Sequence, residues 1–263
     1  TLLLIRMLLT LVPLAILAVA MKSRWPGWRG AGHLAITGLL VQGTYLGGVF
    51  YAIDQGMPSG LVSLIVGLQP LVTALAAVLI LRESVAGRQW LGLVMGLAGV
   101  ALVLAEKLGS GANGGSFSPV TILWAGLSLI GISLGTVYQK RFGTGVDLIS
   151  GTMIQYTAAA AFFAIGAFTL ETRHIEWTVQ FSLALGWLVF GLSVSAILIL
   201  MWLIRRGAAS QVASLFYLVP PVTALEAFIL FNERLGPLAI AGGVVAVAGV
   251  ALVVTGGPRP LNR

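Results

Sequence analysis

Pro70-Leu71-Val72-Thr73-Ala74-Leu75 recurs 150 residues later in the chain as Pro220-Pro221-Val222-Thr223-Ala224-Leu225. Single residues recur at the same offset: Glu83 as Glu233, Gly92 as Gly242, and Gly99 as Gly249. The likeness extends over residues 56–103 and 206–253. A repeat of this length inside an apolar chain indicates two duplicated membrane halves, and such proteins bind their ligands between the halves.

The composition is that of an integral membrane protein. The 263 residues are 58% hydrophobic and only 9% charged, whereas about a quarter of the residues in soluble domains carry charge. Stretches of roughly 20 apolar residues cross a bilayer as helices, because an open sheet would leave backbone groups unpaired in lipid. We therefore expect an all-α integral membrane protein, with nine visible spans at 1–20, 33–53, 59–81, 88–105, 119–139, 149–170, 182–204, 209–231 and 237–255.

Lysine and arginine are divided unevenly between the two sets of alternating loops. One set carries eleven of these residues, and the other carries three, Lys107, Arg173 and Arg234. The positive-inside rule then places the C-terminus in the cytoplasm, in a bacterial inner membrane. The net charge of +7 is thus a topology signal, and we expect no nucleic-acid partner. The chain has no cysteine, which excludes disulfides and thiolate metal sites, and we expect no cofactor.

The two halves differ in their number of predicted helices. The second half has five, from 119 to 255, and the first has four, so the equivalent of helix 119–139 is expected before Thr1. The intact protein would have ten transmembrane helices. With five helices per half, the copies are inverted relative to each other, which supports alternating access. The expected domains are a first repeat at 1–106, a Gly/Ser-rich linker at 107–118 and a second repeat at 119–256.

This pattern resembles a known family. Ten helices, two inverted repeats and the Pro-x-x-Thr-Ala-Leu…Glu motif that begins at Pro70 are similar to the EamA-repeat group of the drug/metabolite transporter superfamily. Within that group, the chain resembles the bacterial aromatic amino-acid exporters of the YddG type. The resemblance implies a small-molecule exporter of the inner membrane that lacks an ATPase domain. The sequence agrees, since it contains no Gly-x4-Gly-Lys-Ser/Thr phosphate loop.

Matching polar and aromatic stripes indicate a central cavity. Pro70 and Pro220 lie within predicted helices at equivalent positions, and we interpret them as hinges, with static kinks for packing as the alternative. Small, polar and aromatic residues at helical spacing on neighbouring helices would line the cavity. For any single residue, helix packing is the competing interpretation. The candidates for the lining are Gln42, Tyr45, Ser63, Trp124, Ser128, Tyr138, Ser195, Trp202 and Tyr217.

Few charged residues fall inside the predicted spans. Glu226 is a candidate for proton coupling or for a structural hydrogen bond, because a buried carboxylate needs a partner or a proton. Arg6 lies near a helix end, and we expect it to snorkel to the interface. A seam of small residues would serve either a dimer or packing within the chain, and it consists of Gly92, Gly96, Gly99, Gly242 and Gly249.

Enzyme motifs fit the sequence poorly. Gly131-Ile132-Ser133-Leu134-Gly135 has the spacing of a nucleophile elbow, but it falls inside a predicted helix rather than at a strand-to-helix turn. The two histidines, His33 and His174, lie at opposite membrane faces in the predicted topology. A Ser–His pair is therefore not expected, and no cluster has metal-ligand spacing.

The sequence favours a secondary exporter of small uncharged or zwitterionic metabolites, namely amino acids including aromatic ones. Export of lipophilic cations or drugs is the alternative, because aromatic ring faces attract cations. An intramembrane enzyme is the alternative from another class. The expected partners are a small-molecule substrate and the lipid bilayer, and the oligomeric state stays open between a monomer and a larger assembly.

Labelling of single cysteines in this cysteine-free chain tests the topology. We expect Ala208→Cys, beside the two arginines of a loop predicted to be cytoplasmic, to react with an impermeant thiol reagent only after cells are opened. His174→Cys is the control and should react in intact cells. Labelling of Ala208→Cys from outside would overturn the predicted orientation.

Overall fold

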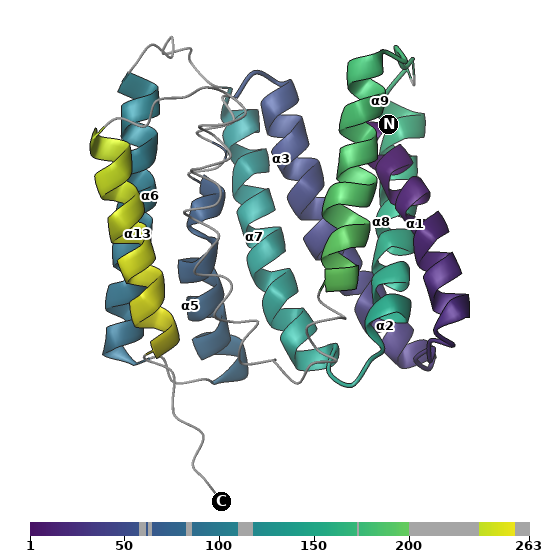
Figure 1. The fold of residues 1–263 in the computed structure, drawn as a ribbon, viewed down its shortest axis with the longest axis horizontal. Coiled ribbons are helices and arrows are strands. Elements are labelled where there is room, and N and C mark those ends of the chain that lie inside the picture. Colours follow the sequence, from purple (N-terminus) through teal and green to yellow (C-terminus); the bar gives the residue numbers. More distant parts are fainter. Residues whose placement is uncertain are drawn as a thin grey trace, which may run out of the picture. The chain divides into compact units, whose positions relative to one another are not determined.

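The computed structural model describes residues 1–57, 62, 65–82, 86–109, 118–172, 174–199 and 237–255, and the regular structure in these ranges is helical (Figure 1). The π-helical segments carry the label η. The helices are α1 (Leu2–Ala20), α2 (Trp28–Gly38), η1 (Leu39–Thr44), α3 (Tyr45–Asp54), α5 (Gln69–Leu81), α6 (Gly87–Gly109), α7 (Pro119–Phe142), α8 (Leu148–Leu170), α9 (Val179–Gly186), η2 (Trp187–Val194) and α13 (Pro237–Thr255).

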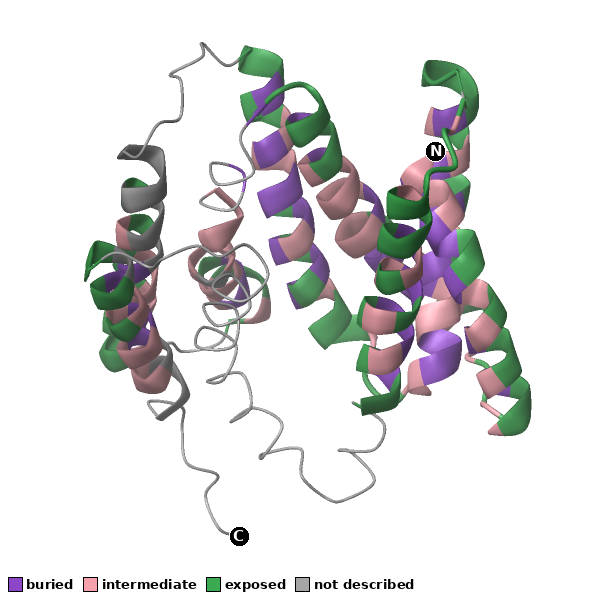
Figure 2. Ribbon diagram, turned by 45° about the horizontal axis from the view of Figure 1, so that its top comes forward, coloured by how far each residue is buried: buried purple, intermediate pink, exposed green. Residues whose placement is uncertain are grey.

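The helices present the apolar surface that a bilayer requires. In the part of the chain that is described, five helical stretches are long and apolar enough to span a membrane, namely Leu2–Ala20, Trp28–Asp54, Pro119–Phe142, Leu148–Leu170 and Val179–Ile199. Large apolar side chains are exposed along these helices, and Val19 is 80% exposed. Figure 2 colours the exposed residues green. The prediction of an all-α membrane protein is confirmed, while the predicted span 209–231 lies outside the described residues.

Local capping explains where several helices begin and end. The Asp147 carboxylate accepts hydrogen bonds from the backbone N–H groups of Ile149 and Ser150, both at 3.1 Å, at the start of α8. The Thr178 hydroxyl accepts one from Phe181 at the start of α9. These side chains satisfy N–H groups that lack a partner inside the helix. Two basic residues in the last turn of α7, Lys140 and Arg141, complement the negative end of the helix dipole.

The predicted helix 59–81 is interrupted near its centre. Leu68 lies in a turn, and α5 begins at Gln69 with Pro70 in its first turn. A proline is tolerated there, because the first N–H groups of a helix have no intrahelical partner. The expectation of a proline inside a continuous helix is therefore wrong for Pro70, since the helix ends and restarts at this point.

The first of the two compact units comprises residues 1–51 and 130–207. In it, α8 packs against α1 on one side and against α2 and η1 on another, while η2 packs against α1. A cluster of buried apolar side chains joins α1 to α8, and Gly38 allows α2 to touch the α8 backbone at Gln155. Because α1 and α8 are equivalent at the 150-residue offset, this unit brings together two copies of the same element.

The second unit, residues 52–129 and 208–263, contains a reciprocal contact between α6 and α13. A Cβ atom added to Gly99 would lie 2.5 Å from the backbone nitrogen of Ala246 and the carbonyl oxygen of Gly242. A Cβ atom added to Gly249 would lie 2.5 Å from the Gly92 carbonyl oxygen and the Gly96 backbone nitrogen. Gly92 and Gly96 are the equivalents of Gly242 and Ala246 in the other copy. Gly99 thus meets residues that precede Gly249 in α13, and Gly249 meets residues that precede Gly99 in α6. The two helices therefore run antiparallel. Gly99 and Gly249 of the glycine seam therefore pack within the chain.

This contact generates a stability prediction. We expect Gly99→Ala and Gly249→Ala each to destabilise the protein by roughly 1–3 kcal/mol, because the new methyl group meets backbone that cannot move independently of its helix. Gly96→Ala is the matched control on the same helix, since a Cβ atom there meets nothing within 4 Å. Thermal unfolding in detergent measures the difference. Equal midpoints for Gly96→Ala and Gly99→Ala would contradict the packing.

Candidate functional site

Two π-helical segments occupy equivalent places in the two halves. Shifted by the offset of 150, η1 (39–44) becomes 189–194, which is the second part of η2. Gln42 lies in η1 and Tyr45 directly follows it, while Ser195, the equivalent of Tyr45, directly follows η2. All three side chains are half-buried. Because π-turns interrupt the regular α-helical ladder and are frequent at functional sites, they mark these segments for attention.

Hydroxyl groups satisfy the carbonyls that the wide turns release. Thr44 Oγ1 donates to Leu39 O at 3.1 Å, and Ser195 Oγ donates to Phe190 O at 2.6 Å. Each bond reaches five residues back along the chain, the spacing of a π-turn. A hydroxyl that donates its proton keeps two lone pairs, so Ser195 remains able to accept a hydrogen bond from a ligand.

Helix α7 carries three more of the predicted lining residues. Ser128 is fully buried and donates to Ala125 O at 2.7 Å, and Trp124 is half-buried one turn earlier. Ser133 is also fully buried, and its hydroxyl has no hydrogen-bond partner among the described residues. Since α7 is continuous from Pro119 to Phe142, Ser133 lies inside a helix and the nucleophile-elbow geometry is excluded.

Tyr138 anchors α7 to α2. Its hydroxyl lies 2.7 Å from His33 Nδ1, and the His33 ring stacks on Phe142 with ring centroids 4.4 Å apart. One hydrogen bond and one ring stack thus join the C-terminal end of α7 to the middle of α2. The Tyr138 hydroxyl has a partner inside the protein, which makes helix packing one function of this predicted lining residue.

The structure brings together a buried polar cluster that the sequence interpretation missed. Arg6 is only 8% exposed, and its Nη2 atom lies 3.5 Å from the Ser193 hydroxyl. The Tyr156 hydroxyl lies 3.2 Å from the same Ser193 oxygen. The expectation that Arg6 snorkels is therefore wrong. A signal was present, since Arg6 falls on the buried stripe of α1 that contains Leu3, Met7, Thr10 and Leu14.

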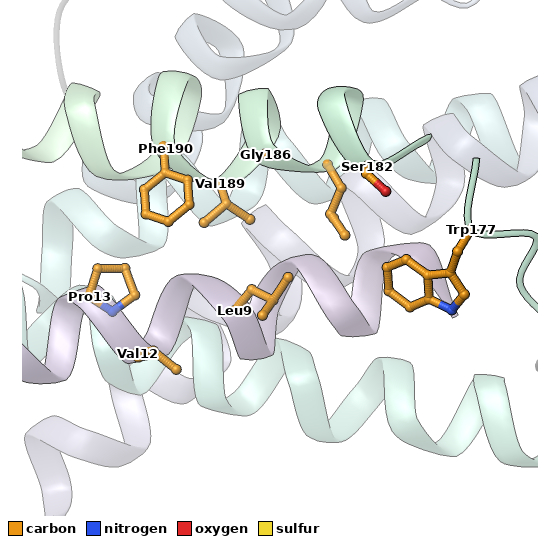
Figure 3. Close-up of a pocket in the computed structure, with 9 residues that line it drawn as sticks. Leu9, Val12, Pro13, Trp177, Ser182, Gly186, Val189 and Phe190 are labelled. Atoms are coloured by element: carbon orange, nitrogen blue, oxygen red, sulfur yellow. The ribbon is translucent and has the colours of Figure 1, made fainter. Parts of the chain in front are cut away.

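A surface groove between α1 and α9–η2 has a different character from the polar cluster. It encloses about 300 Å³, and Figure 3 shows side chains from the two helices facing each other across it. Pro13, inside α1, and Trp177, before α9, contribute to the lining. The lining is apolar apart from Ser182, so the groove suits a lipid acyl chain and offers nothing to bind a charged solute. None of the predicted lining residues borders it.

Several predicted site residues lie outside the described part of the chain, namely Ser63, Trp202, Tyr217, Pro220 and Glu226. Within the described ranges, no group of three His, Asp or Glu side chains is close enough to hold a metal ion. The hydrogen bonds of Ser128 and Ser195 are made inside their own helices, and no described bond joins these two serines to each other. Arg6, Tyr156 and Ser193 are brought into contact as a buried polar cluster.

Apolar spanning helices with buried polar residues between them define a multi-pass membrane protein, and comparison with known proteins identifies its family. The profile of the EamA-like transporter family matches residues 1–105 and 119–255, so the chain belongs to this family. The resemblance noted in the sequence is confirmed.

Named relatives agree with this assignment. The chain is 33% identical over 246 residues to "Uncharacterized transporter YvbV" of Bacillus subtilis, with 89% of this chain and 73% of the relative covered. It is 29% identical over 255 residues to "Probable terminal-alkyne amino-acid exporter" of Streptantibioticus cattleyicolor, with coverage of 94% and 81%. One solved crystal structure shares the fold, with a TM-score of 0.68, 23% identity and coverage of 95% of this chain and 86% of the other.

Proposed function

We propose that this transporter exports small uncharged or zwitterionic metabolites, in particular amino acids including aromatic ones. The observation that carries the proposal is the position of half-buried polar and aromatic side chains at the equivalent π-helices. Gln42 lies in η1, and Tyr45 and Ser195 directly follow η1 and η2. Rings stack against an apolar side chain, and hydroxyls and amides bind the polar end of a solute. The names of two relatives, an amino-acid exporter and an amino-acid metabolite efflux pump of Escherichia coli, support the substrate class.

The transport mechanism that we propose is alternating access by two inverted five-helix repeats. The antiparallel, reciprocal contact of α6 with α13 supports this arrangement, because an inverted duplication relates its copies by a two-fold axis in the membrane plane. The contact of α1 with its equivalent α8 supports the same symmetry. Exchange of conformation between the two halves would expose the cavity to one side of the membrane at a time, with the C-terminus cytoplasmic.

Export of lipophilic cations is the second candidate, since Tyr and Trp faces attract cations. The buried Arg6 argues against it, because a guanidinium inside the bundle repels a second positive charge where little water screens it. A zwitterion also carries a carboxylate, which compensates this repulsion. The charge of the described interior therefore favours an amino acid over a cationic drug.

Flux measurements on the purified protein in liposomes test the substrate class. We expect counterflow of labelled phenylalanine, tyrosine or tryptophan above that of empty liposomes, and a several-fold reduction by Trp202→Ala and Tyr217→Ala, which remove two predicted lining rings. Sugar phosphates should not be carried, because desolvating a dianion is costly. Transport of sugar phosphates without any amino acid would overturn the assignment.

A second measurement tests the proposed hinges. We expect Pro70→Ala and Pro220→Ala to slow transport several-fold while leaving the protein folded, because alanine restores an N–H group and favours a continuous, stiffer helix. Pro13→Ala is the control, since Pro13 lies inside α1 and its equivalent is Phe163. The hinge role fails if Pro70→Ala and Pro220→Ala express normally and transport at the wild-type rate, as Pro13→Ala is expected to do.

A further inference from the structure

Arg6 is a buried cation whose hydrogen-bonding capacity is almost unused. Its guanidinium carries five N–H donors, and the described contacts satisfy one of them, with Ser193 Oγ at 3.5 Å. Its Nε atom is buried and has no hydrogen-bond partner among the described residues. An arginine in this state inside a membrane helix is costly, so it marks a functional position.

The neighbouring hydroxyls cannot neutralise this charge. Ser193 donates its one proton to Leu188 O at 3.0 Å and therefore accepts from both Arg6 and Tyr156. Tyr156 in turn donates to Ser193. The three side chains thus form a chain of donors that ends on a backbone carbonyl, and none of them supplies a negative charge to the guanidinium.

The described residues also offer no carboxylate to Arg6. Among them, no acidic side chain lies within 4.0 Å of Arg6. A buried guanidinium normally binds a carboxylate or phosphate through its planar fork. Among the described residues, this fork has no anionic partner.

The cluster lies where the two halves of the chain meet. Arg6 in α1 and Tyr156 in α8 are equivalent residues at the 150-residue offset, and both reach the same serine. The helices that carry them pack against each other in the first unit. Ligand sites of duplicated transporters lie between equivalent elements, so this position is suited to a solute.

We propose that Arg6 binds the carboxylate of the transported solute, with Ser193 and Tyr156 as positioning residues that hold the guanidinium in place. This inference rests on the proposed export of amino acids and assigns one residue to one end of the substrate. A carboxylate that reaches a largely dehydrated guanidinium gains a charge-assisted, bidentate pair. Loss of such a pair reduces affinity by roughly tenfold or more.

Three indole compounds separate the contributions of the ligand groups. Tryptophan carries both a carboxylate and an ammonium group, indolepropionate only the carboxylate, and tryptamine only the ammonium. Each is titrated against the purified full chain in detergent, and affinity is read from the rise in the thermal unfolding midpoint. We expect wild type to bind tryptophan and indolepropionate, and to bind tryptamine at least tenfold more weakly.

Variants of Arg6 then test the residue itself. Arg6→Gln should weaken both carboxylates by roughly tenfold or more without weakening tryptamine, while Arg6→Lys retains part of the affinity because it keeps the charge and loses the fork. Arg29→Gln, which removes an exposed arginine next to Trp28, is the control for net charge. Tyr156→Phe and Ser193→Ala should lower the ratio of tryptophan to tryptamine affinity by a smaller factor. Folding is not the obstacle, since Arg6→Gln removes an unpaired buried charge.

Each outcome bears on the inference. It is overturned if wild type binds no carboxylate, if Arg6→Gln binds carboxylates as wild type does, or if it weakens tryptamine by the same factor. Inorganic phosphate that binds as tightly as indolepropionate would overturn the assignment to a solute carboxylate. Flux of labelled tryptophan judges the proposed function separately. Binding of indolepropionate through Arg6 without tryptophan flux would retain the anion site and reject amino-acid export.

Discussion

Hydrocarbon offers no hydrogen-bond partners, so every polar group inside a membrane protein must find one within the chain. This constraint explains why the described structure is helical, and it also explains the details that depart from regular helix. The carbonyls released by η1 and η2 are bound by Thr44 and Ser195, five residues further along the chain. Among the described residues, the Ser133 hydroxyl and the guanidinium of Arg6 are exceptions, and Arg6 is the one for which we propose a ligand.

The duplication preserves the backbone while it varies the chemistry at equivalent positions. Tyr45 and Ser195 follow matching π-helices, and Arg6 and Tyr156 occupy matching places in α1 and α8. A symmetric fold thus carries an asymmetric set of polar groups. The zwitterionic substrate that we propose has two different ends, and an asymmetric set of side chains can bind such a molecule in one orientation.

Apolar patterning predicted the helices well, because length and hydropathy decide which segments cross a bilayer. The predicted span 237–255 coincides with α13, and 149–170 differs from α8 by one residue. The polar cluster around Arg6 was not predicted. Helical stripes assume 3.6 residues per turn, and the π-turns at η1 and η2 rotate the residues that follow them. The burial of Arg6 depends on α8 and η2, which are distant in sequence, so its position near a helix end was misleading.

The reciprocal glycine contact has a consequence for how the two halves can diverge. Where α1 meets α8, side chains such as Met7 and Phe163 touch, and a smaller residue on one helix can be offset by a larger one on the other. Gly99 and Gly249 instead touch backbone, for which no smaller replacement exists. At this contact, a side chain added to one helix cannot be compensated by a smaller residue on the other, so neither glycine can be replaced independently. The sequence similarity between the two halves is therefore retained where α6 packs against its equivalent, α13.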